Sequence, residues 1–316
     1  MAAIDCGTNS IRLLIGYIED GQWVDIVRTM NIVRLGQGVD RTGMLAQEAI
    51  DRTVEQACDY AQLCRQHDVQ KLRFVATSAT RDAGNRDEFF AGIRAATGVE
   101  PEVISGAEEA TLSFYGATGS VADIVYPALV IDIGGGSTEF VVGYRTATGV
   151  EVDCAHSFNM GSVRVTEMFP GINAEGEEKN AAIAAASRWV SDLVKQADQI
   201  CDFSRVRSVI GTAGTITTIA AHALELSEYD SEAIHGSIHL LSDMGQSCQF
   251  MMVESPSVKA NLGYMPAGRE DVIAGGAIVW HEILTRVKLS SPSLTAVTVS
   301  DRDILDGVAH SLVTRA

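Results

Sequence analysis

One short motif occurs twice in this chain, and the two copies constrain its fold more than any other feature. The first copy covers residues 4–17 and reads IDCGTNSIRLLIGY. The second begins 127 positions later, covers residues 131–144 and reads IDIGGGSTEFVVGY. Each copy has an apolar strand ending in aspartate, a turn of small residues, and a second apolar strand. The pattern predicts two β-hairpins and, because repeated motifs mark repeated structural units, two similar domains facing each other across a cleft.

The turn of each predicted hairpin has the composition of a phosphate-binding loop. Glycine permits backbone conformations that other residues avoid and carries no Cβ, so several backbone N–H groups can converge on one anion. The candidate phosphate ligands in the two turns are Thr8, Asn9, Ser10, Gly134, Gly135, Gly136 and Ser137. The aspartates that precede the turns, Asp5 and Asp132, offer the hard oxygen ligands that Mg²⁺ prefers.

The rest of the chain alternates between strand and helix patterns. Apolar spacing predicts helices over residues 47–66, 87–96, 108–116, 162–169, 177–201 and 271–286, with a last helix from 302. Strands are predicted over residues 24–33, 71–77, 99–104, 150–157, 206–210 and 295–299. Alternating strands and helices indicate the α/β class. We place the first domain at residues 1–120 plus 302–316 and the second at 121–301.

Composition narrows the possible partners and compartment. A chain of 316 residues with 46% hydrophobic and 21% charged residues is long enough for two globular domains. Its net charge of −17 argues against a nucleic-acid or anionic-membrane partner, because both require a basic surface. The sequence shows no signal peptide and no long apolar run, which predicts a cytoplasmic protein. The six cysteines form no CxxC pair, so we expect reduced, mostly buried thiols and no zinc site.

A second type of phosphate site is predicted where a strand leads through a glycine-rich loop into a helix. Its candidate ligands are Gly211, Thr212, Gly214 and Thr215. None of the glycine loops contains the lysine of a Walker A motif. The triple glycine at 134–136 is followed by another strand rather than a helix, which excludes a dinucleotide-binding fingerprint.

Several motifs occur in a fixed order: the two hairpins, residues 77–85, SGAEEA at 105–110, GSVR at 161–164 and GTAGT at 211–215. Together they resemble the exopolyphosphatase and guanosine pentaphosphate phosphohydrolase family, within the actin, sugar kinase and heat-shock ATPase superfamily. The resemblance spans nearly the whole chain. It implies two duplicated actin-like (ribonuclease H-like) domains and a homodimer. It also implies a short two-domain form, since longer relatives carry an additional C-terminal domain.

The resemblance assigns roles to several residues outside the two turns. Glu109 aligns with the catalytic glutamate of the family and would accept a proton from the attacking water. Its neighbour Glu108 is expected to be exposed. Arg81 and Arg269 match arginines that would contact phosphate through two donors each. Arg164 is a weaker candidate that would hold the domains together.

The two hairpins differ in a way that predicts different tasks. Asp132 and Glu139 lie on either side of the triple glycine, so both carboxylates can reach one Mg²⁺, with Mn²⁺ as the alternative metal. Asp5 is the symmetric metal candidate in the first copy. Arg12 occupies the position that Glu139 has in the second copy, which predicts that the first hairpin binds the negatively charged phosphates of the substrate.

These features predict an exopolyphosphatase, a Mg²⁺-dependent enzyme that releases terminal orthophosphate from inorganic polyphosphate. Guanosine pentaphosphate is the alternative substrate, because it also ends in a phosphoanhydride. A different class, a nucleotide-dependent kinase or ATPase, would need an adenosine pocket at residues 211–215. A non-catalytic polyphosphate sensor would keep the loops without depending on Glu109. The histidines at 235 and 239 are expected to be structural rather than metal ligands.

Overall fold

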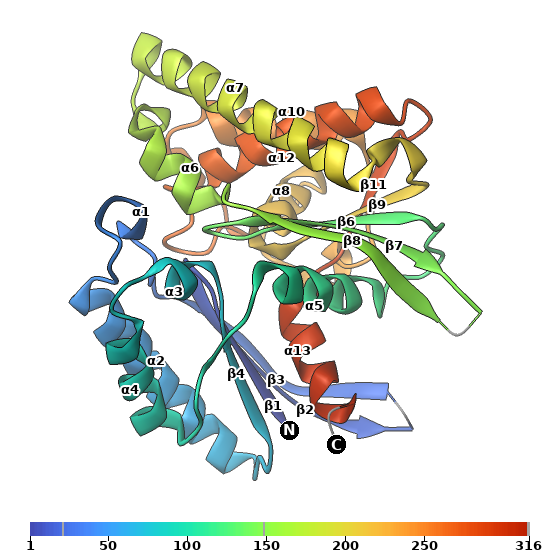
Figure 1. Cartoon of the computed structure of the whole chain (residues 1–316). Coiled ribbons are helices and arrows are strands. Elements are labelled where there is room, and N and C mark those ends of the chain that lie inside the picture. Colours follow the sequence, from blue (N-terminus) through green and yellow to red (C-terminus); the bar gives the residue numbers. More distant parts are fainter. Residues whose placement is uncertain (21, 148, 315–316) are drawn as a thin grey trace. The chain divides into compact units, whose positions relative to one another are not determined.

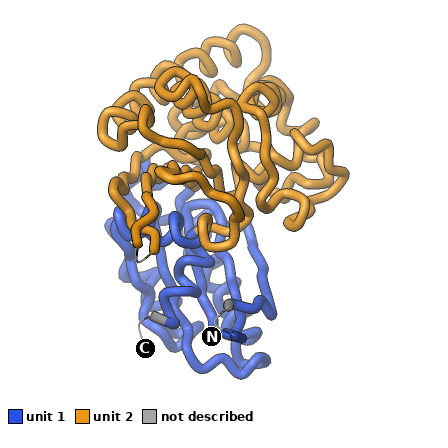
Figure 2. The backbone as a smooth tube through the Cα atoms, turned by 90° about the vertical axis from the view of Figure 1, so that its right-hand side faces the viewer, with its two compact units in different colours: residues 1–116, 304–316 blue, residues 117–303 orange. Residues whose placement is uncertain are grey.

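The computed structural model describes residues 1–20, 22–147 and 149–314. The chain forms two compact units, shown in different colours in Figure 2. Unit 1 contains residues 1–116 and 304–316, and unit 2 contains residues 117–303. These limits lie within a few residues of the domain boundaries expected from the sequence. In the part of the chain that the structure describes, no helix has the length and apolarity needed to cross a membrane.

Unit 1 is built around a five-stranded sheet with the order β3-β2-β1-β4-β5. Its strands are β1 (Ala2–Cys6), β2 (Ser10–Glu19), β3 (Gln22–Ile32), β4 (Leu72–Ala76) and β5 (Glu102–Val103). Its helices are α1 (Val39–Thr42), α2 (Gln47–Gln66), α3 (Ser78–Asp82), α4 (Arg86–Thr97), α5 (Gly106–Thr118, which runs into unit 2) and α13 (Ile304–Thr314). The first three strands are antiparallel, whereas β4 and β5 run parallel to β1.

Helices cover both faces of this sheet (Figure 1). Because side chains alternate along a strand, Ile4 and Leu13 point to one face, where α2 and α4 complete the larger core. Ala3 and Leu14 point to the opposite face, where they pack against α13. Burial on both faces explains why β1 reads as an apolar run up to Asp5.

Unit 2 repeats this plan with a six-stranded sheet of order β10-β11-β9-β6-β7-β8. Its strands are β6 (Ala128–Ile133), β7 (Thr138–Arg145), β8 (Val150–Phe158), β9 (Ser208–Thr212), β10 (Ile238–Leu240) and β11 (Ala296–Val299). Its helices are α6 (Ser162–Met168), α7 (Gly176–Cys201), α8 (Ala213–Ala223), α9 (Ser231–Ile234), α10 (Leu241–Val253), α11 (Pro256–Lys259) and α12 (Ile273–Ser290), with 3₁₀ turns at Pro170–Asn173 and Phe203–Arg205. Strands β6, β7 and β8 are antiparallel, and β9 runs parallel to β6, as β4 does to β1.

The duplication holds at the level of single residues. Asp5 pairs with Arg12 across the first hairpin, and Asp132 pairs with Glu139 across the second. The strand register also shifts at the same place in both copies, between Ile15 and Gly16 and between positions 142 and 143. A Cβ on Gly16 would lie 2.4 Å from the carbonyl oxygen of residue 24, so this bulge requires glycine.

The sequence prediction of the secondary structure was wrong at a few places. Helix α3, which follows the strand predicted over 71–77, was not predicted. The strand expected over 99–104 is reduced to β5, because Pro101 cannot donate a hydrogen bond to a neighbouring strand. Helix α10 was not predicted at all.

The expectation that all six cysteines are reduced was also wrong. A disulfide joins Cys154 in β8 to Cys201, the last residue of α7. The pair lies 47 positions apart in the sequence, and its two Cα atoms are 5.6 Å apart. Strand β8 and helix α7 pack against each other, which brings the two cysteines together without a short spacing motif. The other four cysteines are free thiols.

Two lysine side chains of unit 2 bind carbonyl oxygens at the C-terminal end of helix α10. Lys179 donates to the carbonyl oxygens of Val253 and Glu254, and Lys259 donates to that of Met251 at 3.3 Å. Ammonium groups at a helix C-terminus neutralise its negative dipole end. Lys259 is fully buried, and its pKa is lowered to about 8 by its burial first and by the charge of Lys179 second.

We therefore expect Lys259 to give the protein a pH-dependent stability. Between pH 8 and 10.5 the unfolded chain holds a proton that folded Lys259 has released, so its contribution to the free energy of unfolding rises with pH. Across this window, the free energy of unfolding of the wild type should gain roughly 2 to 3 kcal/mol relative to Lys259→Met. Urea denaturation at several pH values measures this difference. The control Lys195→Met, at an exposed lysine, should show no such difference from the wild type. If the free energy of unfolding changed with pH in the same way in Lys259→Met and the wild type, the expectation would be contradicted.

Candidate active site

In unit 1, the turn of the first hairpin is held by its carbonyl oxygens. The amide of Gly7 closes the turn on the carbonyl oxygen of Ser10 at 2.9 Å. The carbonyl oxygen of Thr8 accepts from the amide of Gly36 at 2.8 Å, and that of Asn9 accepts from the amides of residues 33 and 34. The segment after β3 therefore fixes the turn from behind.

In unit 2, the second hairpin is held in the same way. The amide of Gly134 closes the turn on the carbonyl oxygen of Ser137 at 3.0 Å. The start of α6 then binds the next carbonyl oxygens: the amide of residue 162 donates to Gly134 at 3.0 Å, and that of residue 163 donates to Gly135 at 2.9 Å. Arg164 adds a side-chain bond from its Nε to the carbonyl oxygen of Gly136 at 2.8 Å.

A glycine makes each of these close contacts possible. A Cβ on Gly161 would lie 2.3 Å from the carbonyl carbon and oxygen of Gly135 and 2.5 Å from the amide nitrogen of Gly136. A Cβ on Gly36 would lie 2.3 Å from the Cγ2 atom of Thr8. Sequence reasoning did not identify either glycine as part of the site. The signal was available, because LG at 35–36 and MG at 160–161 follow corresponding strands of the repeat.

The carbonyl oxygens of the two turns are bound within the protein, but several of their backbone amides are not. Within residues 1–20, 22–147 and 149–314, the backbone amides of Thr8, Asn9, Gly135 and Gly136 donate no hydrogen bond. Unpaired amides in a glycine turn form a binding site for an anion such as phosphate.

Side-chain oxygens in unit 1 show the same lack of partners. The buried oxygens of Thr8, Asn9, Ser78 and Thr80 have no hydrogen-bond partner in the described part of the chain. Thr8 and Ala79 would both touch a Cβ on Gly36, which places the first turn beside α3. Buried polar groups without partners are costly, so such a group of them indicates a site that a polar ligand completes. Sequence reasoning had named neither Ser78 nor Thr80.

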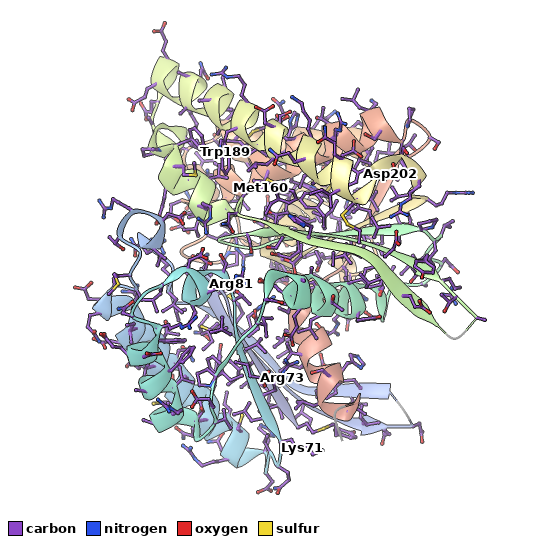
Figure 3. All side chains as sticks on the ribbon, in the orientation of Figure 1. Lys71, Arg73, Arg81, Met160, Trp189 and Asp202 are labelled. Atoms are coloured by element: carbon purple, nitrogen blue, oxygen red, sulfur yellow. A yellow bond between two sulfur atoms is a disulfide. The ribbon has the colours of Figure 1, made fainter. Side chains whose placement is uncertain are left out.

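Glu109 and Arg81 form an ion pair in unit 1. Glu109 lies in the first turn of α5 with 7% of its surface exposed, and Arg81 lies in α3 (Figure 3). The Nη1 atom of Arg81 lies 3.0 Å from Oε2 of Glu109 and 3.0 Å from the carbonyl oxygen of Ile104. Since α3 follows β4 and α5 follows β5, the parallel pairing of these two strands brings both side chains to one edge of the sheet.

The acidic residues of the two hairpins are in different surroundings. In unit 1, Oδ2 of Asp5 accepts from Nη2 and Nε of Arg12 at 2.6 and 3.1 Å. In unit 2, Asp132 and Glu139 are opposite one another and nearly fully buried, and Oε1 of Glu139 accepts from Ser157 at 2.7 Å. A cation is repelled beside Arg12, so this difference favours the second hairpin over Asp5 as the metal site.

The residues of the second hairpin fit a magnesium ion by their chemistry. Mg²⁺ is commonly held by one or two carboxylates together with substrate phosphate oxygens and water. Asp132 and Glu139 supply two such carboxylates at the edge of a turn with unpaired amides. The part of the chain that the structure describes holds no cluster of three or more histidine, cysteine, aspartate or glutamate side chains suited to a metal.

The loop at residues 211–215 is engaged mostly within unit 2. The hydroxyl of Thr212 lies 2.9 Å and 2.8 Å from the carbonyl oxygens of residues 300 and 302. A Cβ on Gly211 would meet Ile216 and Trp280, so this glycine serves packing. Thr215 is buried against α12.

Arg269 lies directly against the same loop. Its Nη1 donates to the carbonyl oxygen of Gly214 at 3.0 Å and to the hydroxyl of Thr218 at 2.9 Å. A Cβ on Gly214 would be 2.4 Å from its Nη2 atom. A ligand that approached Gly214 from this side would meet the guanidinium group first. Roles in phosphate binding for Arg269 and for residues 211–215 stay predictions.

The chain matches a known protein family over most of its length. Residues 14–316 match the Ppx/GppA phosphatase family. The chain is 42% identical to exopolyphosphatase 2 of Mycobacterium tuberculosis, over 99% of this chain and 98% of that protein. It is also 35% identical to part of a bifunctional 3-dehydroquinate synthase/phosphatase of Fusobacterium nucleatum, over 90% of this chain and 43% of that protein.

Solved structures agree with the fold. A crystal structure described as an exopolyphosphatase-like protein superposes with a TM-score of 0.93 at 38% identity, covering 99% of this chain and 98% of that one. The Ppx/GppA family member of Aquifex aeolicus superposes with a TM-score of 0.80 at 26% identity, covering 99% and 97%. These matches and the repeated plan of the two units confirm the predicted α/β class with two duplicated domains. The chain belongs to the Ppx/GppA phosphatase family.

Proposed function

We propose that this protein is an exopolyphosphatase, which hydrolyses the terminal phosphoanhydride bond of inorganic polyphosphate. The observation that carries the proposal is the pair of glycine turns with bound carbonyl oxygens and unpaired amides. Each turn, within its own unit, offers amides that suit a phosphate group. The relative from Mycobacterium tuberculosis, which matches over nearly the full length, carries the name exopolyphosphatase.

The proposed reaction uses Glu109 as the general base. Water attacks the terminal phosphorus, its proton passes to the Glu109 carboxylate, and the bond from phosphorus to the bridging oxygen breaks to release orthophosphate. Arg81 holds Glu109 at 3.0 Å and would move toward the negative charge on the transferring phosphoryl group. A phosphate that took the guanidinium group would leave the Glu109 carboxylate able to accept a proton.

Asp132 and Glu139 are the proposed holders of Mg²⁺, with Mn²⁺ as the alternative. A bound Mg²⁺ would neutralise charge on the phosphate oxygens. Ser157 orients Glu139 through its 2.7 Å hydrogen bond, the kind of support that metal-binding carboxylates commonly receive.

Metal dependence tests this assignment. Ser157→Ala is expected to raise the Mg²⁺ concentration for half-maximal activity about 10-fold, and Glu139→Gln to raise it beyond about 100-fold, because a lost ligand costs more than a lost support. The control Glu151→Gln removes an exposed carboxylate from neighbouring β8 and should change nothing. Calorimetric titration with Mg²⁺ gives an independent measurement. Equal metal affinity in Glu139→Gln and the wild type would contradict the assignment.

Substrate choice is tested by direct competition. Purified protein is given polyphosphates of defined length beside guanosine pentaphosphate, and the release of orthophosphate from each is followed. We expect polyphosphate to have the higher kcat/KM. A higher value for guanosine pentaphosphate would replace the proposed activity with the alternative one.

The structure of unit 2 weighs against the nucleotide-dependent kinase. That function needs room for adenosine at residues 211–215, where Arg269 lies against Gly214 and the Thr212 hydroxyl is bonded internally. Phosphate transfer from ATP to an added acceptor would support the kinase instead. A polyphosphate sensor would bind polyphosphate without releasing orthophosphate.

A homodimer is proposed from the family resemblance, and the cytoplasmic location stays a prediction from the sequence. Light scattering of the purified protein tests the oligomeric state. The Cys154–Cys201 disulfide argues against the cytoplasm, because disulfides are rare there. Alkylation of thiols in intact cells before lysis, followed by mass spectrometry, would show whether the bridge forms in the cell.

A further inference from the structure

Arg73 is a buried arginine at the centre of a charged network in unit 1. It lies in β4 with 4% of its surface exposed (Figure 3). Its Nη2 atom lies 2.9 Å from a carboxylate oxygen of Glu102 and 2.9 Å from one of Glu108. Its Nη1 atom donates to the hydroxyl of Ser311 in α13 at 2.8 Å. One guanidinium group thus joins β4, β5, α5 and the C-terminal helix.

The contact with Glu108 matters because Glu109 is the next residue. Both lie in the first turn of α5. Ser105, the residue before α5, binds two amides of this turn. Its hydroxyl accepts from the amide of Glu108 at 3.1 Å, and its carbonyl oxygen accepts from the amide of Glu109 at 2.9 Å. Arg73 holds the same turn from the sheet, through the Glu108 carboxylate.

We infer that Arg73, acting through Glu108, is a positioning residue for Glu109; the inference rests on the proposed role of Glu109 in hydrolysis. The two contacts at Glu108 fix the start of α5, and the Arg81 contact fixes the Glu109 carboxylate. Glu108 is more than the exposed neighbour predicted from the sequence, because its side chain is partly buried and ion-paired.

Arg73 has a second carboxylate partner, Glu102, which allows a positioning role to be distinguished from a general contribution to stability. Glu102 neutralises the same guanidinium group but belongs to β5 and not to the first turn of α5. A salt bridge to a buried charge is weak evidence for stability, because desolvation offsets the attraction between the charges. Loss of Glu102 should therefore spare Glu109, whereas loss of Glu108 should release it.

The kinetic test compares these partners. Glu108→Gln and Arg73→Gln should lower kcat about 10- to 100-fold with KM unchanged within about twofold, since a small misplacement of a catalytic group has costs of this order. Arg73→Lys should recover part of the loss, because lysine keeps the charge but lacks the fork of donors. Glu102→Gln and Ser311→Ala should stay within about twofold of the wild type. Equal losses in Glu102→Gln and Glu108→Gln would overturn the inference.

A second measurement does not depend on activity. Hydrogen exchange at the amides of residues 108 and 109 should accelerate in Arg73→Gln and Glu108→Gln but not in Glu102→Gln. If the wild type releases no orthophosphate, the proposed function fails and the exchange result alone decides the role of Arg73. Unchanged exchange in both Arg73→Gln and Glu108→Gln would overturn the inference, whatever the activity.

Discussion

The variant Glu109→Gln should release orthophosphate from polyphosphate about a thousandfold more slowly than the wild type. Glutamine has the shape of glutamate and can still accept a hydrogen bond from Arg81, but it cannot take a proton from water. General bases contribute about 10² to 10⁴ in rate, and a loss of about a thousandfold lies in the middle of that range. The loss should appear in kcat, measured by orthophosphate release at saturating polyphosphate.

Two further variants show whether the loss comes from the missing base. Glu100→Gln removes the same charge from an exposed ion pair with Arg94 and should leave kcat unchanged. Glu109→Asp keeps a carboxylate on a shorter side chain and should fall between Glu109→Gln and the wild type. Near-normal kcat in Glu109→Gln would refute the assignment of the base and would favour a role in substrate binding.

The repeat allowed much of unit 1 and unit 2 to be predicted. Each hairpin is a local structure whose strands and turn are adjacent in the sequence, so the pairing of Asp132 with Glu139 could be read from the spacing. Long amphipathic helices were also predictable: α2 occupies 47–66 as expected, because its apolar residues recur at helical spacing. Helix α10 was missed although Leu241, Met244, Cys248 and Met251 recur at helical spacing, because its Ser and Gly residues are weak helix formers.

What could not be predicted depends on contacts between distant segments. The Cys154–Cys201 bridge needs β8 to pack on α7, and no spacing rule encodes this contact. The network of Arg73 joins residues that lie 29 to 238 positions from it in the sequence. Likewise, Gly161 looks like an ordinary turn glycine until the second hairpin is seen to lie against it.

Gly161 provides the second large effect, because the neighbouring atoms are backbone and cannot rotate away. Its φ of −110° and ψ of 174° are open to alanine, so Gly161→Ala introduces no backbone strain of its own. The added Cβ would lie 2.3 Å from Gly135, and either the turn or the start of α6 must move. Because a displacement of about 1 Å can cost about 100-fold, we expect kcat/KM for polyphosphate to fall at least that much.

A graded series separates this contact from the general effect of adding a methyl group. Gly36→Ala would press on the Thr8 side chain, which can rotate, and on the Cβ of Ala79 at 2.9 Å, a milder overlap than the backbone contacts at Gly161. Its loss of activity should therefore be smaller than that of Gly161→Ala. Gly245→Ala, inside α10 with no atom within 4 Å of the new Cβ, should keep full activity and gain up to about 1 kcal/mol in stability. The order of activity, Gly245→Ala above Gly36→Ala above Gly161→Ala, follows only if the turn must hold its place for polyphosphate to bind. Equal activity in all three would show that the carbonyl contacts behind the second hairpin do not set the geometry of the site.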